Sequence, residues 1–361
     1  MRNFFLVSSY LLRSKRAGIL KDKKTIPTGA DRTLLLECIQ KYTARTEEAM
    51  QRDLESALSE SDPLLLEVLQ YSLFQGGKRL RPVLAILSSR LCGGTDDDIL
   101  YLLAATFEYL HAGSLIHDDV IDHAENRRGK ESVVKKYGMA AAILAGDWLH
   151  ARCMHLIGTL AGQKGLDIVC NATQGMVDGE FLQLRYAADS TVTEEQYFSV
   201  VLRKTAGLIS ATCAIGALHA QANAMEQQAL ACYGEKIGIA FQIIDDLLDY
   251  LGDEQVTGKV VGNDFIEGKM TLPLIHALAH VQDTDKAVLL HTLESISRDR
   301  AGCARARQLM QKADSFAFAR QLAQQEIEEG LAALSCFDSR QHRESLMVLE
   351  QLAGYILRRD R

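Results

Sequence analysis

The chain has 361 residues, of which 47% are hydrophobic, and its formal net charge is -7. This length allows a sizeable core in one large domain or two ordinary ones. The acidic balance argues against nucleic acid as a partner, because binding to a phosphate backbone needs a basic surface. The 8 cysteines include no C-x-x-C pair, so the chain encodes neither a zinc cluster nor a compact disulfide framework.

Residues 1–30 form a basic N-terminal extension. The first 21 residues contain no acidic residue and five basic ones, which are Arg2, Arg13, Lys15, Arg16 and Lys21. This composition resembles an organelle targeting segment and predicts a mitochondrial location. An ordinary basic N-terminus is the alternative, and it leaves the cytoplasm or another organelle open.

From residue 31 to residue 361, apolar residues recur at helical spacing and no segment alternates with period two. We therefore expect one all-α domain, a helical bundle. Asp62-Pro63 predicts the start of a helix that ends at Gly76-Gly77. Pro82 is a candidate start for the next helix, which should end at Gly93-Gly94.

Four further segments follow in chain order. Thr95 to Asp98 has the spacing of a capping box, and its helix should reach about Asp122, on the order of 40 Å away. Thr193 to Gln196 opens another helix. Thr205 to Met225 lacks charged residues but is rich in small and polar ones, so we expect a packed central helix rather than a membrane span. The Gly-, Asp- and Lys-rich stretch 252–268 indicates a long functional loop.

Two acidic turns share one pattern. Asp118, Asp119 and Asp122 in "LIHDDVID" have the same spacing as Asp245, Asp246 and Asp249 in "FQIIDDLLDY". The first and last aspartate of each set are four residues apart and point from one helical face. Because the flanking residues are apolar, a wholly solvated face is a poor explanation for either set.

Opposed carboxylates of this kind suit Mg²⁺, which keeps several waters and bridges to substrate phosphates. A di-iron carboxylate bundle is the rival metal site, but it requires glutamates and a Glu-x-x-His element, which neither turn contains. "GNDFIEGKMT" superficially resembles a phosphate-binding P-loop. However, its glycine spacing is wrong and no strand precedes it.

Cations that could bind phosphate accompany the acidic turns. Arginine grips phosphate oxygens with two hydrogen bonds, whereas lysine acts as a mobile point charge. The candidates are Lys78, Arg79, Arg81, Arg127, Arg128, Lys204, Lys259 and Lys269.

Five motifs together resemble one family. "GGKRLRP", "LIHDDVID…RRG", "RKTA", "FQIIDDLLDY" and "GNDFIEGKMTLPLI" occur in the order seen in trans-isoprenyl diphosphate synthases. The long-chain branch, which makes ubiquinone side chains, is the most similar. The resemblance covers the chain from about Asp31 onward and implies an isoprenoid-synthase helical bundle with a central apolar cavity.

The resemblance implies a prenyl transfer from an allylic diphosphate (farnesyl or geranylgeranyl) to isopentenyl diphosphate, with Mg²⁺, three ions when substrate is bound. It implies that Asp118, Asp122 and Asp245 bind the metal, while Asp119, Asp246 and Asp249 act through water or orient neighbours. The implied isopentenyl diphosphate contacts are Lys78, Arg81, His111 and Arg128. Those for the allylic diphosphate are Arg127, Lys204 and Lys259, with Lys269 as a further substrate contact. Thr205 and Gln242 match positions that line the reacting carbons.

Product length should depend on the helix that carries the first acidic turn. Its positions toward the N-terminus are Ser114, Gly113, Leu110 and Phe107, and the small residues at 113 and 114 leave the first level open. We therefore expect a product near C45, within C40 to C50, unless the Phe107 ring forms a floor.

Several alternatives compete with this prediction. A shorter-chain farnesyl or geranylgeranyl diphosphate synthase uses the same chemistry. Head-to-head synthases and terpene cyclases need no second diphosphate site, and a lipid carrier needs no metal. A non-catalytic subunit of a hetero-oligomer should have lost aspartates, whereas both acidic turns are intact. A homodimer is the expected assembly, with a hetero-oligomer as the alternative.

Overall fold

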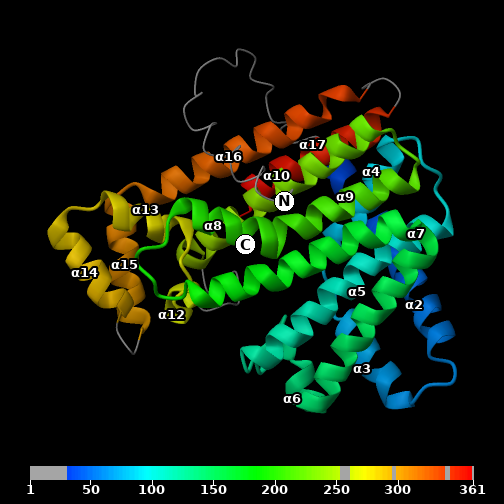
Figure 1. Ribbon diagram of the computed structural model, residues 1–361, viewed down its shortest axis with the longest axis horizontal. Helices are drawn as coiled ribbons and strands as arrows, with labels where there is room; N and C mark the ends of the chain where they lie inside the picture. Colours follow the sequence, from blue (N-terminus) through cyan, green and yellow to red (C-terminus); the bar gives the residue numbers. More distant parts are fainter. Residues whose placement is uncertain (1–30, 253–260, 295–297, 338–341, 360–361) are drawn as a thin grey trace.

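The computed structural model describes residues 31–252, 261–294, 298–337 and 342–359. These residues are almost entirely helical, which confirms the predicted all-α class (Figure 1). The described elements are α2 (Asp31–Ala57), α3 (Pro63–Leu73), α4 (Leu80–Leu91), α5 (Asp98–Ile121), β1 (Asn126–Arg127), β2 (Lys130–Glu131), α6 (Val133–Tyr137), α7 (Met139–Arg185), α8 (Glu194–Val201), η1 (Leu202–Ala206), α9 (Gly207–His219), α10 (Ala224–Leu251), α12 (Asn263–Glu267), α13 (Leu272–His280), α14 (Asp283–Glu294), α15 (Arg300–Lys312), α16 (Ser315–Ala333), η2 (Leu334–Cys336) and α17 (Arg343–Leu357).

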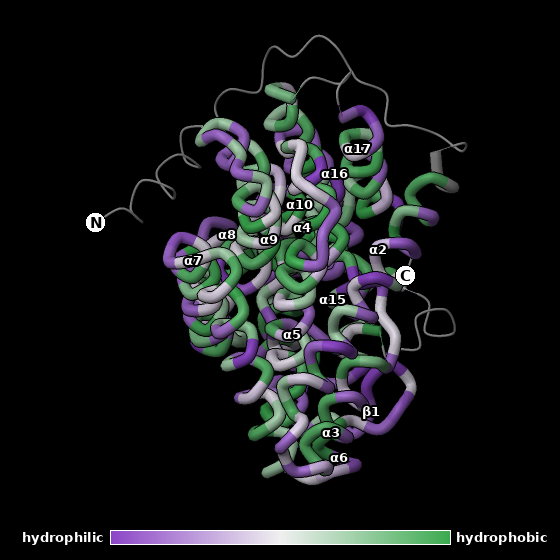
Figure 2. Tube along the Cα trace, turned by 90° about the vertical axis from the view of Figure 1, so that its right-hand side faces the viewer, coloured by the Kyte–Doolittle hydropathy of each residue, from purple (hydrophilic) through white to green (hydrophobic). Residues whose placement is uncertain are grey.

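The long helices form a bundle in which sequence neighbours are often spatial neighbours. α5 lies along α7, α4 packs on α9, and α10 lies between α9 and α16 (Figure 1). α3 and α6 sit together at one end, and α13, α14 and α15 group at another (Figure 1). Figure 2 shows hydrophilic and hydrophobic residues alternating around most helices, so that each one has an apolar side to bury.

The buried apolar residues form two clusters. One is built around α4, α9, α10 and the C-terminal helices, and the other around α2, α3, α5 and α7. Tyr233 and Phe107 are among the fully buried rings, one in each cluster. The first acidic turn thus ends a helix of one cluster, and the second acidic turn ends a helix of the other.

Several predicted helix boundaries are confirmed. Asp62 caps α3 by accepting a hydrogen bond from the backbone N–H of Leu64. Thr193 forms a capping box with Gln196 at the start of α8. The prediction for α5 was wrong in detail: its N-cap is Asp97, whose carboxylate accepts from the Leu100 N–H, and no capping box starts at Thr95.

Two other expectations need correction. α4 begins at Leu80, two residues before Pro82, and its N-cap Arg79 has a left-handed backbone with φ 46°. The uncharged run from Thr205 to Met225 is not one helix, because α9 ends at His219 and α10 starts at Ala224. It does pack centrally, since most α9 side chains are buried.

By length and composition alone, Asp98–Ile121 and Glu194–His219 could each cross a membrane, and 72% of the apolar window in Asp98–Ile121 is buried inside the protein. A buried core helix has the same properties, which agrees with the place of α5 in the bundle. The N-terminal extension 1–30 lies outside the described residues.

Candidate active site

The first acidic turn lies at the C-terminal end of α5, where Asp122 is the C-cap. Asp118 is half-buried, whereas Asp122 is exposed. The pKa of Asp118 is raised to about 6, mainly by burial and also by the charges of Glu180 and Asp122, against the opposing effect of Lys204 and Arg127. Burial and the charge of Glu180 likewise raise the pKa of Asp122, against the effect of Lys204. The neighbouring lysine and arginine therefore do not fully compensate the negative charge of these two carboxylates.

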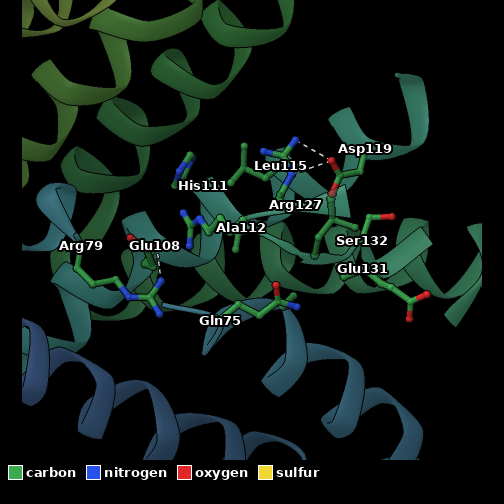
Figure 3. A pocket seen from close by; sticks show the side chains of 14 residues that line it. Gln75, Arg79, Glu108, His111, Ala112, Leu115, Asp119, Arg127, Glu131 and Ser132 are labelled. Atoms are coloured by element: carbon green, nitrogen blue, oxygen red, sulfur yellow. Dashed lines mark hydrogen bonds and ion pairs between the residues drawn. The ribbon is translucent and has the colours of Figure 1, made fainter. Parts of the chain in front are cut away.

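Asp119, in the same turn, is only 1% exposed. Its Oδ1 accepts a hydrogen bond from Arg127 Nε at 2.7 Å and forms an ion pair with a terminal nitrogen of the same guanidinium at 2.6 Å (Figure 3). Arg127 belongs to β1 of the small hairpin that follows α5. Asp119 thus fixes the arginine side chain, which fits the orienting role that the sequence implied for it.

A π-helical turn, η1, carries Lys204 and Thr205. Single π turns inside helices are frequent at functional sites. Lys204 pairs with Glu180 on α7, beside the first acidic turn. Thr205 donates from Oγ1 to Gln242 Oε1 on α10 at 2.8 Å. Two adjacent residues of η1 therefore connect α7 and the first acidic turn to the helix that carries the second.

The second acidic turn is near the end of α10, and its middle aspartate is fully buried. Asp246 accepts three hydrogen bonds, from Tyr197 Oη at 2.7 Å, Gln242 Nε2 at 2.9 Å and Lys269 Nζ at 2.9 Å. With so many donors, Asp246 orients its neighbours and has little capacity left for a metal ion.

Lys269 and Asp264 extend this network into the loop after α10. Lys269 Nζ also contacts Asp264 Oδ2 at 3.0 Å, and the Asp264 N–H donates to Asp249 Oδ2 at 3.1 Å. Burial disfavours the charge of Lys269, but Asp246 and Asp264 outweigh it and hold its pKa well above the ordinary value. Burial and the nearby Asp264 raise the pKa of Asp249 to about 7. The expected role of Lys269 as a direct substrate contact stays a prediction, because two carboxylates already neutralise it.

Asp245 differs from both of its partners in the second turn. Its side chain is 44% exposed, and its Oδ1 lies 3.7 Å from a guanidinium nitrogen of Arg359, just after α17. That guanidinium also covers the Phe241 ring at 4.7 Å. Asp245 is thus the most accessible carboxylate of its turn, in agreement with its predicted selection as a metal ligand.

A cationic pocket lies beside α5 and includes Asp119 of the first acidic turn. Its lining includes Arg79, Glu108, His111, Arg127 and Arg128 (Figure 3). Burial and four neighbouring arginines hold the pKa of His111 well below its ordinary value, so the imidazole is neutral. His111 therefore contributes a polar edge rather than a charge, and it lies where the sequence places a diphosphate contact.

Of the predicted isopentenyl diphosphate contacts, His111 and Arg128 line this pocket, and Arg81 lies close enough to Arg128 for their charges to interact. Arg128 donates to the Gly76 carbonyl, which ties the hairpin to the "GGKRLRP" turn. Burial lowers the pKa of Arg81, Arg128 lowers it further, and Glu108 opposes both. Lys78 donates to the Tyr355 hydroxyl, and its Nζ lies 5.0 Å from the centre of that ring.

The sequence prediction missed several residues of the site. Four residues that the sequence analysis did not select contact predicted site residues: Glu180, Tyr197, Asp264 and Tyr355. Of these, Glu180, Tyr197 and Tyr355 belong to no local sequence motif that would indicate a site. Asp264 lies within "GNDFIEGKMT", where only the loop's composition suggested function. Lys259 lies outside the described residues.

The chain-length positions require a correction. A Cβ atom at Gly113 would lie 3.2 Å from the Gly146 carbonyl oxygen and 3.4 Å from the His150 ring. Gly113 therefore allows α5 to approach α7 closely and does not border open space. Leu110 and Phe107 are fully buried in the apolar cluster, whereas Ser114 remains partly accessible.

The carboxylate oxygens of the first acidic turn are suitable ligands for magnesium. Among the described residues, no three His, Cys, Asp or Glu side chains are already gathered around a single point. Asp118 and Asp122 nevertheless form an oxygen pair whose pKa values are both raised, and a bound divalent cation would lower them. Such a pair suits an ion that takes its remaining oxygens from water and substrate.

Comparison with known proteins gives a consistent result. The family model described as polyprenyl synthetase matches residues 62–310. The octaprenyl diphosphate synthase of Escherichia coli is 34% identical over 326 residues, which cover 90% of this chain and 99% of that protein. The geranylgeranyl diphosphate synthase of Sulfolobus acidocaldarius is 34% identical over 318 residues, or 85% of this chain and 94% of that protein. A decaprenyl diphosphate synthase structure from Rhodobacter capsulatus superposes with a TM-score of 0.82 at 33% identity, covering 91% of this chain and 99% of that one.

Proposed function

The chain belongs to the polyprenyl synthetase family and is a trans-prenyltransferase, and we propose that it makes a long-chain all-trans polyprenyl diphosphate near C45, within C40 to C50. The substrates are isopentenyl diphosphate and an allylic diphosphate, as throughout the family. One observation supports the prenyl-transfer site itself: η1 links the two acidic turns, with Lys204 beside Asp118 and Thr205 bonded to Gln242.

The reaction follows from the charges of the site. The allylic C–O bond breaks, and the diphosphate leaves with its electron pair. The double bond of isopentenyl diphosphate then attacks the allylic carbon, and loss of a proton to the departing diphosphate restores a double bond. Bound Mg²⁺ would supply the positive charge that stabilises the leaving group.

The residues of the chain have distinct parts in this scheme. Asp118, Asp122 and Asp245 would hold the metal. Arg127, fixed by Asp119, and Lys204 would bind the allylic diphosphate from the protein side. The Thr205 hydroxyl and the Gln242 amide form a polar pair beside the reacting carbons, where their dipoles would stabilise positive charge. No side-chain nucleophile is needed.

The relatives of this chain include synthases of both long-chain and short-chain products. The Escherichia coli relative is an octaprenyl diphosphate synthase and the Rhodobacter capsulatus structure is a decaprenyl one, which favours a long product. The Sulfolobus acidocaldarius relative, a geranylgeranyl diphosphate synthase, keeps a short product as the second candidate. We further propose that the product becomes a quinone side chain and that the enzyme is mitochondrial, on the strength of its basic N-terminus.

A product analysis tests the proposal. Purified protein is incubated with farnesyl diphosphate, labelled isopentenyl diphosphate and Mg²⁺, and the chain lengths are separated by chromatography. Asp118→Ala should lower turnover by at least about a thousandfold, as expected for loss of a principal electrostatic stabiliser. Asp98→Asn, an exposed position at the opposite end of α5, is the matched control and should remain active. A product that stops at C15 or C20 would replace the long-chain assignment by the short-chain one.

A further inference from the structure

Next to the isopentenyl diphosphate site lies a buried ion pair that is not expected to touch substrate. Arg79 NH1 donates to Glu108 Oε1 at 2.5 Å, and the two side chains are only 1% and 5% exposed (Figure 3). Breaking a buried pair leaves an uncompensated charge, so such a pair constrains its surroundings strongly.

Arg79 joins three segments. Its guanidinium also contacts the Glu47 carboxylate of α2 at 3.1 Å and donates to the carbonyl of Leu73 at the end of α3. Its backbone is left-handed, with φ 46°, which is unfavourable for a residue that has a Cβ atom. The side-chain contacts of Arg79 therefore hold a strained turn between Lys78 and Arg81.

The cations around this turn share one nearby carboxylate. Arg81 and Arg128 repel each other, and the only acidic side chain whose charge favours both of them, among the described residues, is Glu108. Arg81 Nε is buried and has no hydrogen-bond partner in the described part of the chain. The guanidinium groups of Arg79, Arg81 and Arg128 thus lie close together. The negative charge of Glu108 offsets part of their mutual repulsion.

We propose that Glu108 is a positioning residue for the isopentenyl diphosphate site, acting through Arg79. It anchors the left-handed turn and balances the charge of Arg79, Arg81 and Arg128. The diphosphate consequently meets a cationic site that is already arranged. This inference rests on the proposed function, because it assumes that the pocket binds isopentenyl diphosphate.

The test compares four variants. Glu108→Gln keeps the size of the side chain but removes its charge, and Arg79→Gln removes the partner. The double variant loses one charge of each sign, so it restores the charge balance. Glu326→Gln is the matched control, because Glu326 pairs with Lys236 at 2.8 Å at comparable burial, between α10 and α16 and away from the pocket.

Glu108→Gln should raise the KM for isopentenyl diphosphate at least about tenfold, the effect of losing one charge-assisted hydrogen bond. The KM for farnesyl diphosphate should change by less than about twofold, since that substrate uses other cations. The double variant should have a lower KM for isopentenyl diphosphate than Glu108→Gln has. The control should lower the Tm without separating the two KM values. Equal effects on both substrates, or a double variant no better than Glu108→Gln, would overturn the proposal.

A direct binding measurement tests this inference independently of the reaction. Titration calorimetry of isopentenyl diphosphate without metal should show the same loss of affinity in Glu108→Gln. If that variant does not fold, Glu108→Asp keeps the charge with a shorter reach and should still weaken binding at least about threefold; unchanged binding would overturn the proposal. A wild-type protein that makes no polyprenyl diphosphate would refute the proposed function, whereas normal isopentenyl diphosphate binding by folded Glu108→Gln refutes only the role of Glu108.

Discussion

Individual carboxylates in this site differ mainly in how much positive charge surrounds them. Asp119 and Asp246 are almost fully buried, and each is satisfied by cations or hydrogen-bond donors. Asp118 and Asp249 are half-buried, and burial raises the pKa of Asp118 to about 6 and of Asp249 to about 7. The spacing is the same in both acidic turns, but the fold gives their aspartates different burial and different partners.

These shifts predict how stability depends on pH. The ordinary pKa of an aspartate is 3.8, so between about pH 4 and pH 7 the folded protein binds more protons at Asp118 and Asp249 than the unfolded chain does. The metal-free protein should therefore lose stability as pH rises through this window. Thermal unfolding in a chelator should show the Tm falling from pH 5 to pH 7, and the stabilisation by Mg²⁺ with diphosphate should grow over the same range.

The control for this prediction is the double variant Asp118→Asn and Asp249→Asn, in which neither position can ionise. Its Tm should decline less between pH 5 and pH 7 than that of the wild type. Parallel declines would show that other groups set the pH dependence.

Arg127 and Arg128 are adjacent in sequence but have different partners. Arg127 is held by Asp119, whereas Arg128 donates to the Gly76 carbonyl in the "GGKRLRP" turn. We expect Arg128→Ala and Lys78→Ala to raise the KM for isopentenyl diphosphate more than that for the allylic substrate, and Arg127→Ala to do the reverse. Steady-state kinetics with each substrate varied in turn measures the split. Equal effects would mean that both diphosphates share one set of cations.

At the level of elements, the crossing of α5 and α7 limits the path of the growing chain. Gly113 faces the Gly146 carbonyl, and a Cβ atom at Gly146 would lie 2.3 Å from His117 Nε2, so the two helices nearly touch at this level. A chain therefore cannot pass between them at Gly113. Ser114, four residues before Asp118, is the accessible position on the metal side of the helix.

This geometry moves the chain-length test from Gly113 to Ser114. Within the part of the chain that the structure describes, the Ser114 hydroxyl bonds only to the His111 carbonyl of its own helix, at 2.8 Å, so replacing it disturbs little else. Ser114→Phe should shorten the products to about C15 or C20 while the first condensation continues, because a ring would stand about 6 Å below the metal ligands. Product chromatography checks this expectation.

Gly113→Phe is the comparison variant for Ser114→Phe. It should lower the Tm and reduce total activity, since the ring must displace α7. Unaltered product lengths in Ser114→Phe would show that the chain leaves the site along another face of the bundle.

At the scale of the whole molecule, α7 carries an apolar surface that the described residues leave uncovered. Val177, Phe181 and Leu184 are 50%, 69% and 58% exposed and lie on one side of the helix. Exposed apolar groups of this kind mark association surfaces, and we expect a homodimer that buries them.

Phe181→Asp should convert the protein to a monomer of 39.9 kDa in sedimentation at micromolar concentration. Its charge cannot be buried in an apolar interface without a partner. Leu36→Asp, an exposed apolar position on α2, is the control and should remain dimeric. A wild-type protein that is itself monomeric would refute the homodimer and favour a separate partner subunit.

The helical class, several helix ends and the two acidic turns could be predicted from the sequence because they depend on local physics. Helical periodicity, the Asp62-Pro63 start and the capping box at Thr193 all act within a few residues. The two aspartate triplets and the basic motifs were visible for the same reason, and their order in the chain was sufficient to indicate the family.

What only the tertiary structure decided is which of these groups meet. The burial of Asp246, the pairing of Glu180 with Lys204, the contact between Lys78 and Tyr355 and the Arg79–Glu108 pair all join residues from separate elements. Gly113 illustrates the limit: its small size suggested open space, but only the position of α7 shows that a backbone carbonyl fills it. Periodicity and capping are written in neighbouring residues, whereas burial and charge balance depend on helices far apart in the chain.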